Sequence, residues 1–199
     1  MRQVTVETHI SAPREDVFDF LADLAGRPAI TDHYLRDYRL ARVRPYGKGA
    51  AVRFCLRAPF AKEWAELQIT ECDKPRRIVE EVRVGRLGRS RSLAVYELAA
   101  EAGGVTRVEL TTFSEPATPI DAVKQLGAPG WMKRQTKTAL ERLRMIFEEP
   151  PEAPLARASI AGWEPEKAPR FGEPAGADPS KAPAGGPAPR RAPGGPRAA

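Results

Sequence analysis

Cysteine is scarce in this sequence, with only Cys55 and Cys72 among 199 residues. Two cysteines cannot supply the disulfide framework of a small secreted domain, and their scarcity agrees with a reducing compartment. If the strands that contain them pair through the turn near residues 57–61, Cys55 lies opposite a residue close to Trp64, and Cys72 lies far along the partner strand. Because a disulfide needs closely spaced Cα atoms, a bond between the two cysteines is not expected.

Long apolar runs are also missing. No stretch approaches the roughly 18 apolar residues that a membrane-spanning helix needs. The first residues, MRQVTVETHISAP, contain one arginine and then alternate polar with apolar residues, so they do not resemble a signal peptide. We therefore expect a cytoplasmic protein without a transmembrane segment. Asparagine is absent altogether, which selection against a heat-labile residue and a GC-rich codon bias explain equally well.

The common catalytic and metal-binding motifs are absent. The sequence contains no HExxH, no pair of CxxC motifs, no GxSxG and no Walker loop. His9 falls on the polar face of a predicted strand, and His33, beside Tyr34 in the second predicted helix, could reach the mouth of a cavity. A surface role is favoured for both histidines. We predict neither a metal site nor a cofactor.

Positive charge exceeds negative charge but is not concentrated in one block. The net charge of +6 divides into about +4 for residues 1–149 and about +2 for the remainder. Several arginines are expected on the outward face of a sheet, where they alternate with glutamates. The arginines are Arg53, Arg57, Arg83, Arg89 and Arg91, and the glutamates are Glu66, Glu81, Glu97 and Glu109. This pattern favours a solvated face over a surface for nucleic acid or an anionic membrane, so no specific nucleic-acid partner is predicted.

Proline, glycine and alanine dominate the end of the chain, where 12 of the 20 prolines lie between Pro150 and Ala199. Such a segment buries too little apolar surface to offset the entropy of ordering it. We therefore expect a folded domain over residues 1–149 and a disordered tail over residues 150–199. Residues 155–171 contain Ile160, Trp163 and Phe171 within this tail, which suggests a docking segment for a protein partner or one that folds back on its own domain.

The first part of the folded region reads as a strand followed by two short helices. Residues 3–10 alternate apolar with polar side chains, as a strand with one wet face does. Ser11 is a candidate N-cap and Pro13 suits the first helical turn, so a helix is expected to run from there to about Gly26. A second short helix or turn is expected over residues 29–35.

Six strands are expected next, because turn signals at regular intervals divide segments of alternating hydrophobicity. The turns fall near residues 45–49, 58–59, 73–77, 85–88 and 103–104. Consecutive strands with short connections form an antiparallel meander that is apolar on one face and charged on the other.

A long amphipathic helix closes the folded region. Its apolar stripe runs from Met132 to Phe147 with helical spacing, and it is the one element long enough to cover the apolar face of the sheet. Proline and glycine at 127–130 predict a break or kink before this stripe. The residues ahead of it, 119–126, then form a separate segment able to cover or uncover a cavity between helix and sheet.

The order of these segments resembles a known superfamily. The stretches ISAPREDVFDFLADL, GAAVRFCLRAP, ITECDKPRRIVEEV and VYELAAEAGGVTRVEL, followed by a long helix, are similar to START/Bet v 1-like (SRPBCC) proteins, and among them to bacterial polyketide cyclase/dehydrase-like proteins. The resemblance covers residues 3–149 and implies an α+β helix-grip fold. In that fold a curved, seven-stranded antiparallel sheet surrounds a C-terminal helix and an apolar ligand cavity. Many members carry a tryptophan just after the first helix, where this chain has residues 26–30 without one.

Four polar residues are in phase with the inward face of the predicted sheet: Glu63, Glu80, Tyr96 and Thr112. A buried carboxyl group has a raised pKa and can serve as a general acid or base in an apolar pocket, which makes Glu80, Tyr96 and Glu63 candidate catalytic residues. The alternative is that the two glutamates lie near strand ends and meet solvent or one of the many arginines.

We predict that the cavity binds a hydrophobic, lipid- or polyketide-like small molecule. The expected lining residues are Tyr34, Phe54, Leu56, Leu67, Val82, Tyr96, Leu110, Thr112, Trp131 and Gln135. Two alternatives stay open: a cyclase or dehydratase that moves protons with the cavity glutamates and tyrosine, and a protein-interaction module that uses the basic face and the tail.

Overall fold

The computed structural model describes residues 2–58, 61–85, 90–115 and 128–162, all of which belong to one compact unit, Met1–Ala168. The predicted covering segment over residues 119–126 and the aromatic residues Trp163 and Phe171 lie outside the described residues.

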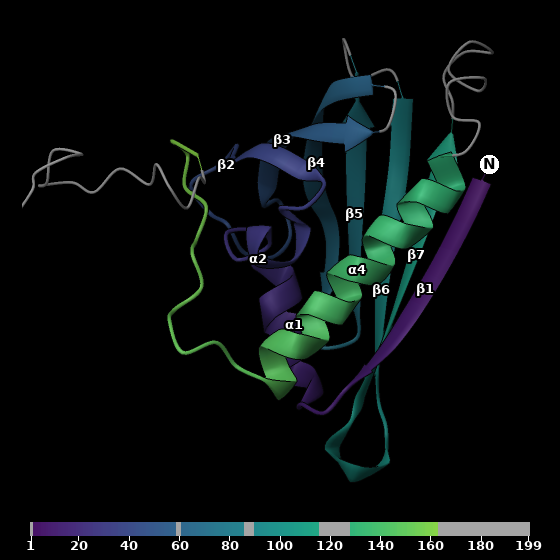
Figure 1. Ribbon diagram of the computed structural model, residues 1–199, viewed down its shortest axis with the longest axis vertical. Coiled ribbons are helices and arrows are strands. Elements are labelled where there is room, and N and C mark those ends of the chain that lie inside the picture. The colour runs from purple at the N-terminus through teal and green to yellow at the C-terminus, as the bar shows by residue number, and fades with distance from the viewer. Residues whose placement is uncertain (1, 59–60, 86–89, 116–127, 163–199) are drawn as a thin grey trace, which may run out of the picture. The chain divides into compact units, whose positions relative to one another are not determined.

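The elements follow the predicted order of one strand, two short helices, six strands and one long helix (Figure 1). They are β1 (Arg2–Ile10), α1 (Arg14–Ala22), α2 (Pro28–Thr31), β2 (Leu35–Leu40), β3 (Ala51–Ala58), β4 (Ala61–Asp73), β5 (Arg77–Val84), β6 (Ser90–Ala100), the 3-10 turn η2 (Ala102–Gly104), β7 (Thr106–Glu115) and α4 (Ala128–Glu148). The strands form one antiparallel sheet in the order β1-β7-β6-β5-β4-β3-β2. The predicted helix-grip fold is confirmed.

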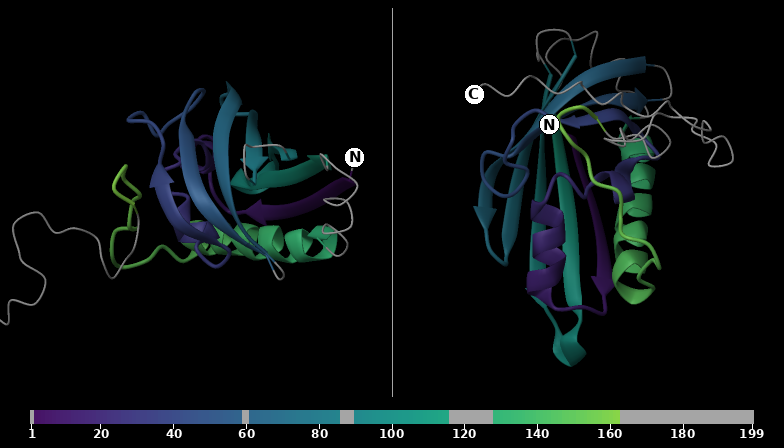
Figure 2. Two further views of the ribbon diagram at one scale, coloured as in Figure 1. Left: turned by 90° about the horizontal axis from the view of Figure 1, so that it is seen from above. Right: turned by 90° about the vertical axis from the view of Figure 1, so that its left-hand side faces the viewer.

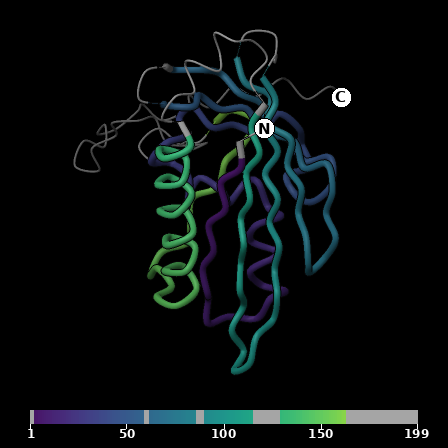
Figure 3. Tube along the Cα trace, turned by 90° about the vertical axis from the view of Figure 1, so that its right-hand side faces the viewer, coloured from purple at the N-terminus to yellow at the C-terminus, as the bar shows by residue number. Residues whose placement is uncertain are grey.

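The helices share one side of the curved sheet. Figure 2 shows α1 and α4 on this inner side, and Figure 3 shows β1, β7 and β6 running side by side next to α4. Helix α4 packs mainly along β1 and against α2. One cluster of buried side chains, among them Phe18, Leu21, Ile78, Leu140 and Leu143, joins both helices to the sheet. The core therefore lies between the inner face of the sheet and the helices.

The predicted start of the first helix is wrong in detail. Helix α1 begins at Arg14, with Pro13 at its N-cap and no side-chain cap, whereas Ser11 was the expected capping residue. The backbone amide of Ser11 instead donates to Glu148 Oε1, 3.3 Å away. Proline suits this position because the first amides of a helix have no acceptor inside the helix. The helix also ends earlier than predicted, at Ala22.

The predicted break or kink does not fall within residues 128–130, and residue 127 lies outside the described residues. Helix α4 begins at Ala128, so Pro129 and Gly130 form its first turn. Proline does not kink a helix there, because the missing amide would have had no acceptor within the helix.

Residues 150–162 return from the end of α4 to the folded unit. The amide of Ala158 donates to Ala25 O at 2.8 Å, and the amide of Leu40 donates to Ser159 O at 2.9 Å. Arg157 Nη2 lies 2.6 Å from Asp23 Oδ2. The Ala158 side chain is buried within the main core cluster. The first part of the predicted docking segment thus contacts its own domain, between the end of α1 and the edge strand β2.

Cys55 and Cys72 are free thiols, as predicted. Among the described residues, no helix is long and apolar enough to cross a membrane, and no group of three or more His, Cys, Asp or Glu side chains is arranged to hold a metal ion.

Candidate functional site

The inner face of the sheet consists of rows of residues that pair across neighbouring strands. One row contains Ile69, Glu80, Ala94, Thr112 and Val4, in that order across β4, β5, β6, β7 and β1. The next row contains Ile78, Tyr96, Leu110 and Val6. Because paired residues project to the same face, Glu80 and Tyr96 both point inward, as the alternation predicted.

The two ends of this inner face differ in burial. Toward the end of β7 that is next to η2, Ile78, Leu98 and Val108 are at most 5% exposed, beneath side chains of α1 and α4. At the opposite end the inward side chains are only half-buried. These residues are Leu56, Glu63, Val82, Val84, Ala94 and Thr112, and we call them the open half. Glu80 and Tyr96 lie where the open half meets the filled one.

Arg27 reaches this boundary from the segment between α1 and α2. Helix α1 ends at Ala22, so the carbonyl of Leu21 has no helical partner and accepts hydrogen bonds from Arg27 Nε, at 2.9 Å, and from Nη2. The hydroxyl of Thr31 donates to the carbonyl of Arg27 at 2.9 Å. The carbonyl groups of Ala22, Leu24 and Ala25 accept hydrogen bonds from Gly47 N, Tyr38 Oη and Ala158 N. The end of α1 therefore fixes both the backbone and the guanidinium of Arg27.

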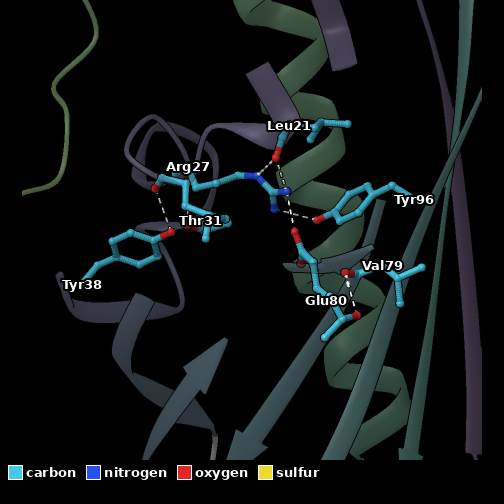
Figure 4. Close-up of polar contacts among 9 residues, drawn as sticks. Leu21, Arg27, Thr31, Tyr38, Val79, Glu80 and Tyr96 are labelled. Carbon is cyan, nitrogen blue, oxygen red and sulfur yellow. Dashed lines mark hydrogen bonds and ion pairs between the residues drawn. The ribbon is translucent and has the colours of Figure 1, made fainter. Parts of the chain in front are cut away.

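A buried polar network joins Arg27 to Glu80 and Tyr96 (Figure 4). Arg27 Nη2 donates to Glu80 Oε1 at 2.5 Å, and Nη1 donates to the Tyr96 hydroxyl oxygen at 3.0 Å. The guanidinium carbon also lies 4.9 Å from the centre of the Tyr96 ring. The side chains of Arg27 and Glu80 are only 4% and 2% exposed, so the two charges meet almost without water.

The environment acts differently on the two charges. Burial raises the pKa of Glu80 above its usual value, and the nearby Arg27 guanidinium acts against that rise. For Arg27, burial disfavours the charged form, but Glu80 and the neighbouring tyrosines outweigh it, so the pKa of Arg27 lies above its usual range. The contact of 2.5 Å is that of a charge-assisted hydrogen bond, and we therefore assign an ionised pair at neutral pH. Burial also raises the pKa of Tyr96 to about 12, which keeps its hydroxyl protonated.

The network leaves groups with hydrogen-bonding capacity. The Tyr96 oxygen accepts from Arg27, so its own hydrogen is free to donate elsewhere. Among the described residues, no donor other than Arg27 bonds the Glu80 carboxylate. The site thus offers one hydroxyl donor, on Tyr96, and one carboxylate acceptor, on Glu80. Together Arg27 and Glu80 carry no net charge. Such a site can hydrogen-bond a neutral polar group that an apolar molecule brings to the inner face.

The connection between α2 and β2 joins the helix α4 through three consecutive residues. Asp32 forms an ion pair with Arg142, His33 Nε2 donates to the carbonyl of Gln135 at 3.2 Å, and Tyr34 meets Trp131 edge to face, with ring centres 6.1 Å apart. His33 Nδ1 is buried and has no partner among the described residues. The predicted surface role of His33 is therefore wrong: its ring is half-buried against α4, and burial lowers its pKa. His9 is exposed, as expected, with Nε2 3.4 Å from Glu101.

The predicted lining residues divide between the core and the open half. Phe54, Leu67, Tyr96 and Leu110 are buried on the inner face, whereas Tyr34, Leu56, Val82, Thr112, Trp131 and Gln135 are half-buried. Phe54 stacks on Tyr38 with ring centres 6.0 Å apart. The cavity that these residues were expected to line stays a prediction.

The candidate catalytic residues are only partly brought together. Glu80 and Tyr96 share the Arg27 guanidinium, but Glu63 pairs with Leu56 at the far end of β4, beyond the rows that contain Ala65 and Leu67. The alternative interpretation of Glu80 was that it meets an arginine, and this is correct although the residue is buried. Arg27 itself was missed as a site residue. A lone charge between Leu24-Ala25-Gly26 and Pro28-Ala29-Ile30 was the signal that could have found it.

A second feature, an open groove, lies elsewhere on the unit. An open groove of about 490 Å³ is lined by Arg14, Arg76 and Arg77 together with Asp73 and Glu97. The Nε atom of Arg14 is buried and has no partner among the described residues. Three cations and two carboxylates line the groove, so its charge is nearly balanced.

Solved structures of several proteins share this fold. A Thermus thermophilus protein matches with 21% identity and a TM-score of 0.57, covering 72% of this chain and 94% of its own. A Rhodobacter sphaeroides protein matches with 16% identity and a TM-score of 0.54, covering 73% of this chain and 91% of its own. The major latex-like protein 151 of Panax ginseng matches with 14% identity and a TM-score of 0.53, covering 73% and 97%. At these identities the likeness establishes the fold alone.

The sequence itself gives the family. No curated protein sequence matches the chain. A family model described as polyketide cyclase / dehydrase and lipid transport matches residues 1–148, which include the whole sheet and α4. The chain therefore belongs to this polyketide cyclase/dehydrase and lipid transport family, within the START/Bet v 1-like superfamily.

Proposed function

We propose that this protein binds a hydrophobic, lipid- or polyketide-like small molecule between the inner face of the sheet and α4. The observation that carries the proposal is the open half, whose inward apolar side chains are half-buried although they belong to the concave face of the sheet. A protein of this size normally buries such residues, and a ligand would complete their burial. The description of the family, which names lipid transport, supports the same class of ligand.

The polar network sets the expected orientation of the ligand. Arg27 and Glu80 neutralise each other, so the site offers no net charge to a free carboxylate or amine. The Tyr96 hydroxyl and the Glu80 carboxylate suit a ligand hydroxyl or carbonyl group instead. The apolar body of the ligand would then extend toward Val82 and Leu56, with Tyr34 and Trp131 near α4.

Native mass spectrometry of protein purified from its own host tests the proposal directly. A bound apolar molecule with few charged groups is expected, and it should be lost after organic extraction. A protein that carries no molecule, and that binds none from a lipid extract of the host, would contradict ligand binding. Identification of the bound molecule would also define the substrate class.

An enzyme of the cyclase or dehydratase type is the second candidate. It is favoured by the pairing of a carboxyl group that has a raised pKa with a protonated tyrosine at the same boundary. If Tyr96 moves protons during turnover, Tyr96→Phe should abolish the conversion of a bound substrate while ligand retention persists. Unchanged conversion in Tyr96→Phe would remove Tyr96 from the mechanism. The separate candidate Glu63 is tested in the same way with Glu63→Gln, and unchanged conversion would remove it.

A cytoplasmic location and a protein partner for the tail are further parts of the proposal. Residues 155–162 contact their own domain, so a partner would engage the chain beyond them or displace them. A pull-down with the full chain and with a chain that ends at Gly162 distinguishes these cases.

A further inference from the structure

An exposed tryptophan stands out on the outer face of the sheet, away from the proposed ligand site. Trp64 of β4 is 51% exposed, more than any other aromatic residue that the structure describes. Its neighbours on this face are Arg36, Arg39, Arg57 and Lys62, all of them exposed. We call these five residues the Trp64 patch. We propose that the Trp64 patch docks the protein on an anionic lipid bilayer.

The strand register places all five side chains on one face. Cys55 pairs with Trp64 on one side and with Arg36 on the other, and Arg57 pairs with Lys62. The extra residue of a β-bulge lies between Arg36 and Arg39, with Asp37 at a φ of 52°. A bulge inserts one residue into the strand, so Arg36 and Arg39 project to the same side although they are three residues apart.

The cations of the Trp64 patch differ from the other arginines of the outer face in lacking carboxylate partners. Arg53 pairs with Glu66 at 2.9 Å, and Arg83 and Arg91 both reach Glu81, at 2.9 Å and 3.7 Å. Within the described part of the chain, no carboxylate lies within ion-pair distance of the four patch cations. Arg39 instead lies 5.4 Å above the Trp64 ring. The patch is thus a local excess of positive charge on a face that is otherwise balanced.

This combination fits an anionic membrane surface. Indole rings favour the boundary between lipid headgroups and acyl chains, and lysine or arginine side chains next to them are attracted to anionic headgroups. A single-stranded nucleic acid would need a series of aromatic side chains for successive bases. In the described rows around Trp64 there is no second exposed aromatic ring. The charge and the single aromatic side chain therefore favour the bilayer.

The Trp64 patch lies on the same strands as the open half, and we connect it with ligand uptake; this step rests on the proposed function. Trp64 lies next to Glu63 in β4, and Arg57 next to Leu56 in β3, so the patch shares two strands with the open half on the opposite face. Docking through Trp64 would hold the open half, on the opposite face of the same two strands, near the membrane from which an apolar ligand is taken.

Co-sedimentation of the full chain with phosphatidylcholine vesicles, with and without phosphatidylserine, tests the proposal. Binding is expected only with phosphatidylserine and should fall as salt screens the charges. Trp64→Ser should weaken binding, and Arg39→Gln with Arg57→Gln should weaken it about fivefold for each charge removed. The matched control is Arg83→Gln with Arg91→Gln, which removes the same charge from the same face and should change binding less than about twofold.

The outcomes separate this proposal from the proposed function. Absence of binding to phosphatidylserine vesicles, or equal losses in the patch and control variants, would overturn it. Binding of a single-stranded oligonucleotide that depends on Trp64, without vesicle binding, would overturn it in favour of nucleic acid. Native mass spectrometry of the same variants should show unchanged ligand occupancy. If no ligand is found but vesicle binding depends on the patch, the docking surface stands and ligand binding fails.

Discussion

Arg27 Nη2 and Glu80 Oε1 lie 2.5 Å apart in the interior, although 53 residues separate them in the sequence. Each charge alone would be costly to bury, whereas together, with the Leu21 carbonyl and the Tyr96 hydroxyl, they satisfy most of each other's hydrogen-bonding capacity. The pair therefore ties the segment after α1 to the middle of the sheet. Stability and, in the proposed function, ligand orientation then depend on the same contact.

Removal of one partner should destabilise the protein more than removal of both. Arg27→Met and Glu80→Leu each leave a buried charge without its counter-ion, and each is expected to lower the free energy of unfolding by about 3–5 kcal/mol. The double variant places apolar side chains at both positions and should lose less free energy of unfolding than either single variant. Urea unfolding of the four proteins measures this coupling.

An exposed ion pair of similar geometry is the matched control. Arg53 and Glu66 join β3 to β4 at 2.9 Å with side chains 61% and 44% exposed. Arg53→Met and Glu66→Leu should each cost no more than about 1 kcal/mol. Equal effects for the buried and the exposed pair would show that Arg27 and Glu80 are not an ion pair of the interior.

Stability should rise with pH because of His33. Burial lowers the pKa of His33 below its ordinary value of 6.5, with Arg142 and Arg36 adding to the effect and Asp32 opposing it. Between the lowered pKa and 6.5 the unfolded chain binds more protons than the folded one, so folding stability is lost as the pH falls through this window. Urea unfolding of the parent protein and of His33→Gln at several pH values measures the difference between their free energies of unfolding. This difference should shrink toward the acidic end of the window.

The titration itself provides a second check. The histidine signals of the folded protein, followed by NMR as a function of pH, should include one that titrates below 6.5 and disappears in His33→Gln. A His33 signal that titrates at or above 6.5 would contradict the burial of Nδ1 against α4.

The returning segment after α4 should contribute to stability through Ala158. Ala158→Asp would place a carboxylate in the core cluster and is expected to cost about 2 kcal/mol or more. Ala161→Asp makes the same change at an exposed position and should be nearly neutral. Hydrogen exchange adds a local measure: the Leu40 amide, which donates to Ser159, should lose protection in Ala158→Asp only. Equal stability of the two variants would mean that the segment is not anchored at Ala158.

Filling the open half should reduce ligand binding without unfolding the protein. Val82→Trp adds a large side chain among half-buried residues of the inner face, and we expect ligand occupancy to fall at least about tenfold. Leu93→Trp makes a comparable change on the outer face, where Leu93 is 37% exposed, and should leave occupancy unchanged. Native mass spectrometry of the two variants measures occupancy, and retention of ligand in Val82→Trp would place the ligand elsewhere.

Alternation along the chain was enough to predict the sheet, because inward-facing side chains occupy every second position in the segments around Val52, Leu67 and Tyr96. The same parity put Glu80 and Tyr96 on the inner face, which the register confirms. Parity assigns a face but does not identify partners. It could not indicate whether Glu80 meets water, a ligand or an arginine.

Arg27 escaped prediction because its environment comes from elements far away in the sequence. Its guanidinium contacts the end of α1, β5 and β6, and none of these contacts leaves a local pattern. His33 escaped for the same reason, since its acceptor is the backbone of α4. The helical state of residues 128–130 was missed because proline and glycine occur where a helix ends as well as where one begins, and only the following residues decide which.

The bulge at Asp37 and the hydrogen bond from Leu40 to Ser159 both fall on β2, which is an outermost strand of an open sheet. An unpaired outermost strand offers its backbone to strands of other molecules, and a bulge or a covering segment interferes with that pairing. At the other margin of the sheet, α4 runs beside β1. Edge-to-edge pairing of sheets is thus disfavoured at β2.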